Sequence, residues 1–208
     1  MSETKFSKST GMTPHRLESL ADGIFAFAMT LLVLSINLPE IGKHLSVGNY
    51  LVSQYGNFWN FALSFILLAV FWLNHSQQFH HIKKTDAATL WLNILVLLFV
   101  VLIPFSTSLM NDYPDDLVAE IFFNSNMFVL SAIMAFNWWY SYKKGYIEVE
   151  GIEEHLAQVS IKGLALPAVA LFATLLAFIA PGWSTLTYLF IPVLNFLFAR
   201  IAFSLKRG

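Results

Sequence analysis

The sequence predicts an all-α, polytopic membrane protein with six transmembrane helices, and three observations lead to that prediction. Hydrophobic residues make up 57% of the 208 residues and charged residues only 12%, about half the charged share of an ordinary globular protein. A chain this apolar cannot bury its surface in one water-soluble core. Six apolar runs have the length of a bilayer, and the loops between them alternate in their content of lysine and arginine.

The six runs each hold about 20 residues, the length that an α-helix needs to cross the hydrocarbon core. They cover residues 17–38, 49–74, 88–110, 117–141, 160–180 and 183–204. All should be helices, because lipid offers no hydrogen-bond partner to an open backbone. The breaks between them are short and carry turn residues. We therefore expect residues 1–208 to form a single domain, with residues 1–13 as a cytoplasmic tail.

Lysine and arginine set the expected orientation, because the cytoplasmic loops of membrane proteins are enriched in both. If both termini are cytoplasmic, every one of the 12 lysines and arginines except Lys43 falls on the cytoplasmic side. The opposite loops carry Glu40, Asp112, Asp115 and Asp116 instead. The pattern predicts cytoplasmic N- and C-termini.

Several function classes find no support in the composition. A net charge of −1 gives no indication of nucleic-acid binding, and the absence of cysteine excludes disulfides and thiolate metal sites. His75, His80 and His81 match no zinc-binding spacing. A membrane enzyme would need polar groups clustered at one depth, whereas Asp22 and Glu120 are expected near opposite ends of the membrane. We expect neither enzymatic activity nor a bound cofactor or metal.

In the first helix, an apolar stripe and two carboxylates lie on different sides of the helix axis. At 100° per residue, one set of side chains lies within about 60° of a common direction. This stripe consists of Gly23, Phe27, Thr30, Leu31, Leu34 and Leu38. Glu18 and Asp22 point to roughly the opposite side. A carboxylate at full membrane depth costs on the order of 3 kcal/mol, so Asp22 needs a partner from another helix, and His75 is the expected one. The stripe alone does not indicate a pore, because every face of a spanning helix is apolar.

The stretch that opens this helix resembles the signature of the transmembrane protein 175 family of potassium channels, found in endosomes, lysosomes and prokaryotes. Arg16 and Asp22 stand at the spacing of that signature, and GIFAFAMTLLVL after them is similar to the family as well. Leu20 and Ala21 stand where the signature has Phe-Ser. Further matches follow in the family's order: Trp72-x-x-His75-x-x-x-Phe79, Thr85-Asp86, Leu92-Asn93 and Pro104-Phe105.

The resemblance implies a fold and a site. A chain with one six-helix unit is similar to the prokaryotic branch, which assembles as a homotetramer in the cell membrane. In that family the first helix of each subunit lines a central pore. By position, the constriction residue is Phe27, with Thr30, Leu31 and Leu34 on later turns of the same wall. Arg16, Asp22, Trp72, His75 and Asn93 are then implied to support the pore helix, with Asn93 as an interhelical hydrogen-bonding group.

The resulting hypothesis is passive potassium flux through a hydrophobic constriction, with potassium as the permeating ion. The chain has no TVGYG-like carbonyl filter, so a ring of apolar side chains would close the path by dewetting. Thr30 hydroxyls would replace part of the ion's water. A secondary transporter is the first alternative, although it would predict internal repeats and broken midplane helices. A proton-permeable channel is a second alternative, because histidines titrate near neutral pH, and a scaffold without flux is a third.

Overall fold

The computed structural model describes residues 13–36, 46–114, 116–148, 152–180 and 182–191, with only the backbone given for 152–164. Within these ranges the chain is helical apart from its connecting turns. The elements are α1 (Pro14–Leu31), η1 (Leu32–Ser35), α2 (Val47–Ser53), α3 (Tyr55–His81), α4 (Ala87–Asp112), α5 (Leu117–Lys143), α6 (Ile152–Ala177) and η2 (Ser184–Phe190).

Four of the described helices are long and apolar enough to cross a membrane: α1 with η1, α3, α4 and α5. The apolar part of α6 whose side chains are described covers Ala165–Ala177. The expected sixth span begins as the 3-10 helix η2, and its residues from 192 onward lie outside the described residues. Four spans are thus found, and the fifth and sixth remain predictions.

The expected second span, 49–74, has the wrong boundaries. Ser46 caps the short helix α2, whose Asn49 amide donates to the Ser46 hydroxyl, and α3 starts only at Tyr55. At its other end α3 continues to His81, well past residue 74. Hydropathy marks where lipid contact ends, whereas a helix continues as long as its polar side chains find partners. His75 and Gln78, beyond the expected end, are buried against neighbouring helices.

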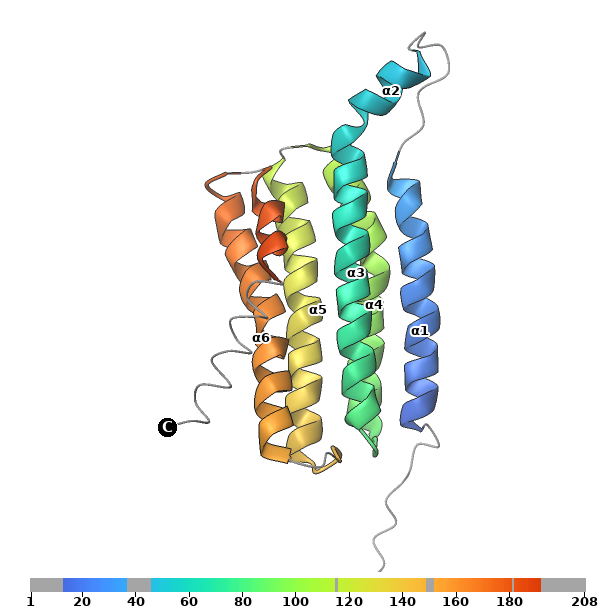
Figure 1. Ribbon diagram of the computed structural model, residues 1–208, viewed down its shortest axis with the longest axis vertical. Coiled ribbons are helices and arrows are strands. Elements are labelled where there is room, and N and C mark those ends of the chain that lie inside the picture. Colours follow the sequence, from blue (N-terminus) through green and yellow to red (C-terminus); the bar gives the residue numbers. More distant parts are fainter. Residues whose placement is uncertain (1–12, 37–45, 115, 149–151, 181, 192–208) are drawn as a thin grey trace, which may run out of the picture.

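The long helices lie side by side, with α1 at one edge and α6 at the other, and α2 projects beyond one end (Figure 1). Helix α1 packs against α3 and α4, while α5 packs between α4 and α6. We call the end with Lys83, Lys84, Lys143 and Lys144 the basic end. The opposite end, with Asp112, Asp116 and Glu120, is the acidic end.

Close packing holds the helices together between these two ends. Phe25 of α1, Phe71 of α3 and Phe123 of α5 are fully buried in one continuous apolar cluster. Lipid is as apolar as these side chains, so helix association in a membrane depends on tight packing and interhelical hydrogen bonds. Small residues allow this tight packing in α1, where Ala21 and Ala28 face α3 and α4 and are fully buried.

At the basic end, backbone hydrogen bonds join two loops that are distant in the sequence. Lys83 N–H donates to the Tyr146 carbonyl at 2.8 Å, and Glu148 N–H donates to the His81 carbonyl at 3.1 Å. These two bonds flank the antiparallel bridge between Ile82 and Ile147. Gly145 makes the preceding turn possible, because its φ of +66° is strained for any residue with a side chain.

Asp86 strengthens the same junction. One of its carboxylate oxygens accepts from the backbone and hydroxyl of Thr89, at 2.9 and 3.0 Å, and thereby caps α4. The other accepts from the hydroxyls of Tyr140, at 2.7 Å, and Tyr146, at 3.2 Å. Partial burial would raise the pKa of Asp86, but the hydrogen bonds from Thr89 and the two tyrosines outweigh it and hold the pKa below its ordinary value. Burial and the nearby carboxylate raise the pKa of Tyr146.

We expect Asp86→Ala to lower stability by about 1 kcal/mol for the lost helix cap, plus the loss of both tyrosine bonds. Asp86→Asn keeps the cap and serves as the matched control. Because the folded carboxyl has the lower pKa, its contribution is complete above the ordinary pKa and disappears as the pH falls through the folded value. Thermal unfolding of the purified protein between pH 3 and 7 should show this acid-sensitive component in the wild type only. Equal acid sensitivity in both variants and the wild type would contradict the assignment.

Candidate pore helix and its polar contacts

Helix α1 buries one face against its own chain. Its buried residues are Leu17, Ala21, Phe25 and Ala28, and Leu32 and Ser35 continue them in η1. Spacings of three and four residues keep these side chains on one side of a helix. That side contacts α3 and α4, so the rotation of α1 about its axis is fixed.

The opposite face of α1 points away from the other helices that the structure describes. Phe27 is 61% exposed and Leu34 is 70% exposed, and Gly23 and Thr30 lie exposed on the same side. Leu31 is only half-buried at the border of this face, and Leu38 lies outside the described residues. The stripe expected from the helical angle is thus an outward surface, available to lipid or to a second copy of the chain.

Thr30 is the one polar side chain in this exposed stripe. Its hydroxyl donates to the Phe27 carbonyl at 2.7 Å, a local bond that threonine commonly makes within a helix. The hydroxyl proton is therefore committed to the helix backbone. The oxygen lone pairs are what Thr30 presents to its surroundings.

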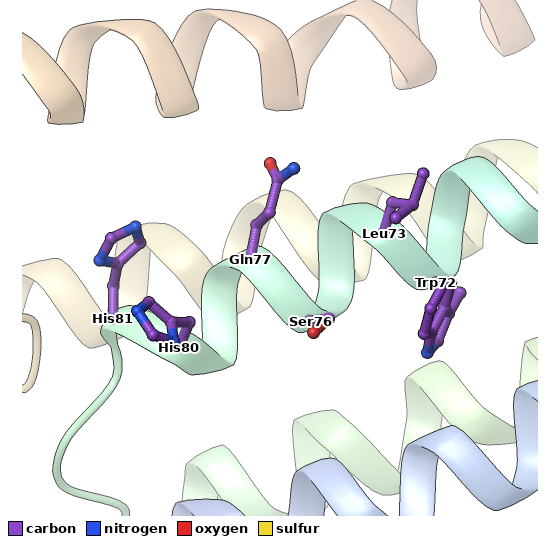
Figure 2. Close-up of a pocket in the computed structure, with 6 residues that line it drawn as sticks. All are labelled: Trp72, Leu73, Ser76, Gln77, His80 and His81. Atoms are coloured by element: carbon purple, nitrogen blue, oxygen red, sulfur yellow. The ribbon is translucent and has the colours of Figure 1, made fainter.

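Two carboxylates on the flank of α1 bind side chains of α3. Trp72 donates its indole N–H to Asp22 at 2.8 Å, and the Ser76 hydroxyl donates to Glu18 at 3.2 Å. The two acids are one helical turn apart on α1, and their two donors are one turn apart on α3. Because the helices are antiparallel, the later acid in the sequence pairs with the earlier donor. In Figure 2, Trp72 and Ser76 point toward α1 (blue), whereas Leu73 and Gln77 point away from it. Each of the two acids thus accepts a hydrogen bond from α3.

The expected pairing of Asp22 with His75 is wrong, because Trp72 takes that position. His75 follows Trp72 by three residues, which turns it about 60° around α3 and toward α4. There it is buried and its Nε2 lies 2.7 Å from Asn93 Oδ1. The imidazole also stacks on Phe79, with ring centroids 4.5 Å apart. Asn93 therefore makes an interhelical hydrogen bond, as its position in an apolar helix indicated.

Arg16 is not part of this polar network. It is exposed, and at 100° per residue it falls on the same side as Gly23 and Phe27, two turns nearer the basic end. The structure thus brings Asp22 together with Trp72 and His75 together with Asn93, and leaves Arg16 on the exposed face.

A second polar chain, which sequence reasoning missed, holds α1 near the acidic end. Asn60 donates to Asn111 Oδ1 at 2.9 Å, and Asn111 donates to the Ser35 carbonyl at 2.8 Å. One turn below, Thr107 donates to the buried Ser64 hydroxyl at 2.8 Å. Polar residues inside apolar runs signal such contacts, but their pairing depends on helix positions that the sequence does not specify.

The side of α3 near the basic end carries a depression of about 230 Å³. Trp72, Leu73, Ser76, Gln77, His80 and His81 line it (Figure 2). All six residues belong to one helix, so no second wall encloses a ligand. Among the described residues no three histidine or acidic side chains gather closely enough to hold a metal ion.

The proteins to which this chain is similar are described as channels. Residues 16–104 match the model of the family described as endosomal/lysosomal potassium channel TMEM175. A potassium channel from Streptomyces collinus is 29% identical over 136 residues, which make up 64% of this chain and 66% of the relative. A potassium channel from Chamaesiphon minutus is 37% identical over 100 residues, 47% of this chain and 49% of the relative. The alignments thus span at most 66% of the length of these two curated relatives.

The fold and the polar contacts of α1 define a polytopic, all-helical membrane protein. The crystal structure of a lysosomal potassium-selective channel TMEM175 homolog from Chamaesiphon minutus matches it with a TM-score of 0.77 at 27% identity. That match covers 91% of this chain and 97% of the other. Residues 16–104 and the fold of the chain thus resemble the TMEM175 family, which is described as potassium channels.

The Trp72–Asp22 bond should stabilise the packing of α1 on α3. We expect Trp72→Phe and Asp22→Ala each to lower the unfolding free energy, with a coupling of about 1 kcal/mol between them, as for one hydrogen bond to a charged group at a partly exposed site. A double-mutant cycle in detergent, followed by denaturant unfolding, measures this coupling. Trp139→Phe, at an exposed tryptophan of α5, is the control. Strictly additive effects of the two substitutions would refute the bond.

Proposed function

We propose that the protein is a potassium-permeable cation channel, a homotetramer in which α1 of each subunit lines a central pore. The observation that carries this proposal is the orientation of α1. Its stripe with Phe27 and Leu34 faces away from its own chain, while its other sides are held by packing and by the Trp72 and Ser76 contacts. A single helix with an unpartnered face needs copies of itself to build a closed wall. The curated relatives and the solved homologue are named as potassium channels, which supports the same function.

In this proposal the four Phe27 side chains form the constriction. Hydrocarbon offers an ion nothing in exchange for its water, so a narrow apolar ring blocks flux by dewetting. Thr30 lies one turn further on, where its oxygen lone pairs would replace part of the hydration shell of a potassium ion. Leu34, and Leu31 at the border, continue the wall toward the acidic end. Potassium is the permeating ion, and the mechanism uses no cofactor.

The membrane arrangement in this proposal is the one that the sequence predicts. One domain of six helices crosses the cell membrane of a prokaryote, with both termini and the basic end in the cytoplasm. The acidic end, with Asp112, Asp116 and Glu120, would face outward and concentrate cations near the pore, weakly and subject to salt screening. Arg16 would stand on the pore face at the cytoplasmic entrance.

Phe27→Ala should raise potassium flux several-fold, because it widens and partly wets the constriction. Potassium uptake into proteoliposomes along a concentration gradient measures this. Phe172→Ala makes the same truncation at an exposed site of α6 and should leave the flux unchanged. Equal flux in wild type and Phe27→Ala would exclude Phe27 as the constriction. Saturable uptake coupled to a second gradient would indicate the transporter alternative, and proton flux without potassium flux the proton channel.

Thr30→Val keeps the shape of the side chain and removes its oxygen, so the ratio of potassium to sodium flux should fall. Thr174→Val is the matched control, since the Thr174 hydroxyl likewise bonds a carbonyl of its own helix, that of Ala170 at 2.8 Å. Both ratios come from the same proteoliposomes with potassium or sodium as the only cation. A ratio unaffected by Thr30→Val would remove this hydroxyl from selectivity.

Cysteine substitution tests the assembly directly, because the chain contains no cysteine. Phe27→Cys and Leu34→Cys should form intersubunit disulfides on oxidation, and a thiol reagent should block flux through each. Leu171→Cys, at an exposed site of α6, should do neither. Native mass spectrometry of the purified protein should give the mass of four chains. A monomer without cross-links would rule out the proposed pore.

A further inference from the structure

A buried carboxylate lies at the acidic end, far from the stripe of α1. Glu120 stands in the first turn of α5 and is only 5% exposed. One carboxylate oxygen accepts from Gly182 N–H and the other from the Ser184 hydroxyl at 2.5 Å. Asn124 supports this arrangement by donating to the Ser184 hydroxyl oxygen at 3.2 Å. Glu120 thus ties α5 to the turn that leads into η2, which lies beside α5 in Figure 1.

The negative charge of Glu120 has no cationic partner among the described side chains. The lysines and arginines with described side chains are Arg16, Lys83, Lys84, Lys143 and Lys144, and all lie at the basic end. A carboxylate offers about four lone-pair positions, and the two donors fill only part of them. Burying a charge without a counter-charge is costly. With respect to the described side chains, the carboxylate therefore has lone pairs left with which to accept a cation from outside.

A cavity of about 210 Å³ opens next to this carboxylate. Its wall includes Trp59 and Asn60 of α3, Tyr113 after α4, Glu120 itself and Thr185 of η2. The Asn60 amide donates to Asn111, which leaves its carbonyl oxygen as an acceptor. Tyr113 is 59% exposed, so a ligand can enter past its ring. A cavity of this size admits several water molecules or a small organic molecule.

We propose that this cavity binds a small organic ammonium ion. A primary ammonium group has three donors, for which Glu120, Asn60 and Thr185 offer acceptors from three elements. The rings of Trp59 and Tyr113 suit the alkyl part and attract a cation over their faces. An inorganic ion would need a fuller shell of oxygen ligands than this wall provides. The bound ion would join α3, α5 and η2, and the proposal does not depend on the function of α1.

The test uses thermal unfolding of the purified full chain in detergent, with n-butylammonium chloride as the probe. The neutral 1-butanol and potassium chloride at the same concentrations are the ligand controls. We expect a saturable rise of the melting temperature with n-butylammonium only, as for any ligand that binds the folded state alone. Glu120→Gln keeps one acceptor oxygen for Gly182 N–H and turns its NH2 toward the Ser184 hydroxyl oxygen, which can accept. It removes the charge, so it should abolish the rise. Glu148→Gln, the same change at an exposed site of the basic end, should preserve it.

Trp59→Leu keeps the proposal testable if Glu120→Gln does not fold. This variant removes the partly exposed aromatic wall and should weaken n-butylammonium binding at least tenfold in isothermal titration, with Glu120 unchanged. An equal rise with 1-butanol would show apolar partitioning, and an equal rise with potassium chloride an inorganic cation site. Either of these two results would overturn the proposal. Undiminished n-butylammonium binding to Glu120→Gln or to Trp59→Leu would overturn it as well.

Discussion

The hydrogen bond from the Trp72 indole to Asp22 is the contact on which the orientation of the first helix depends. An acid one turn inside a membrane helix is tolerated only with a partner, and the donor comes from α3 at 2.8 Å. With Ser76 and Glu18 one turn below, this bond fixes one flank of α1, and Ala21, Phe25 and Ala28 fix the adjacent face. Once two sides are bound, the third side has no neighbour among the described residues of its own chain. Polar contacts and apolar packing together thus determine which apolar surface is left exposed.

The helical angle was enough to predict the stripe with Phe27 and Leu34, because lipid forces the run to be a helix and a helix fixes the side-chain directions. The helical angle alone does not predict which side chains form hydrogen bonds between helices. His75 and Trp72 lie three residues apart on α3, and only the rotation of α3 decides which of them meets Asp22. The ends of the helices could not be predicted either, because α3 continues to His81 through polar residues that hydropathy assigns to water. Glu120 was noticed as an intramembrane acid, but its partners lie about 60 residues away.

The two ends of the bundle are held by different means. At the basic end, backbone bonds around Ile82 and Ile147 join the loops, and Asp86 closes the junction with two tyrosines. At the acidic end, side-chain amides and the carboxylate of Glu120 make the connections. Between them, His75 Nδ1 and Asn93 Nδ2 are buried without a partner among the described residues.

The bond from the Thr30 hydroxyl to the Phe27 carbonyl also has a consequence for charge preference. Because its only proton is turned back into the helix, the oxygen shows electron density to whatever approaches the exposed face. At the level of Thr30 an approaching anion finds no hydroxyl donor, whereas a cation finds a lone pair. This local preference for a cation needs no ionised side chain, although Arg16 adds a positive charge to the same face nearer the basic end.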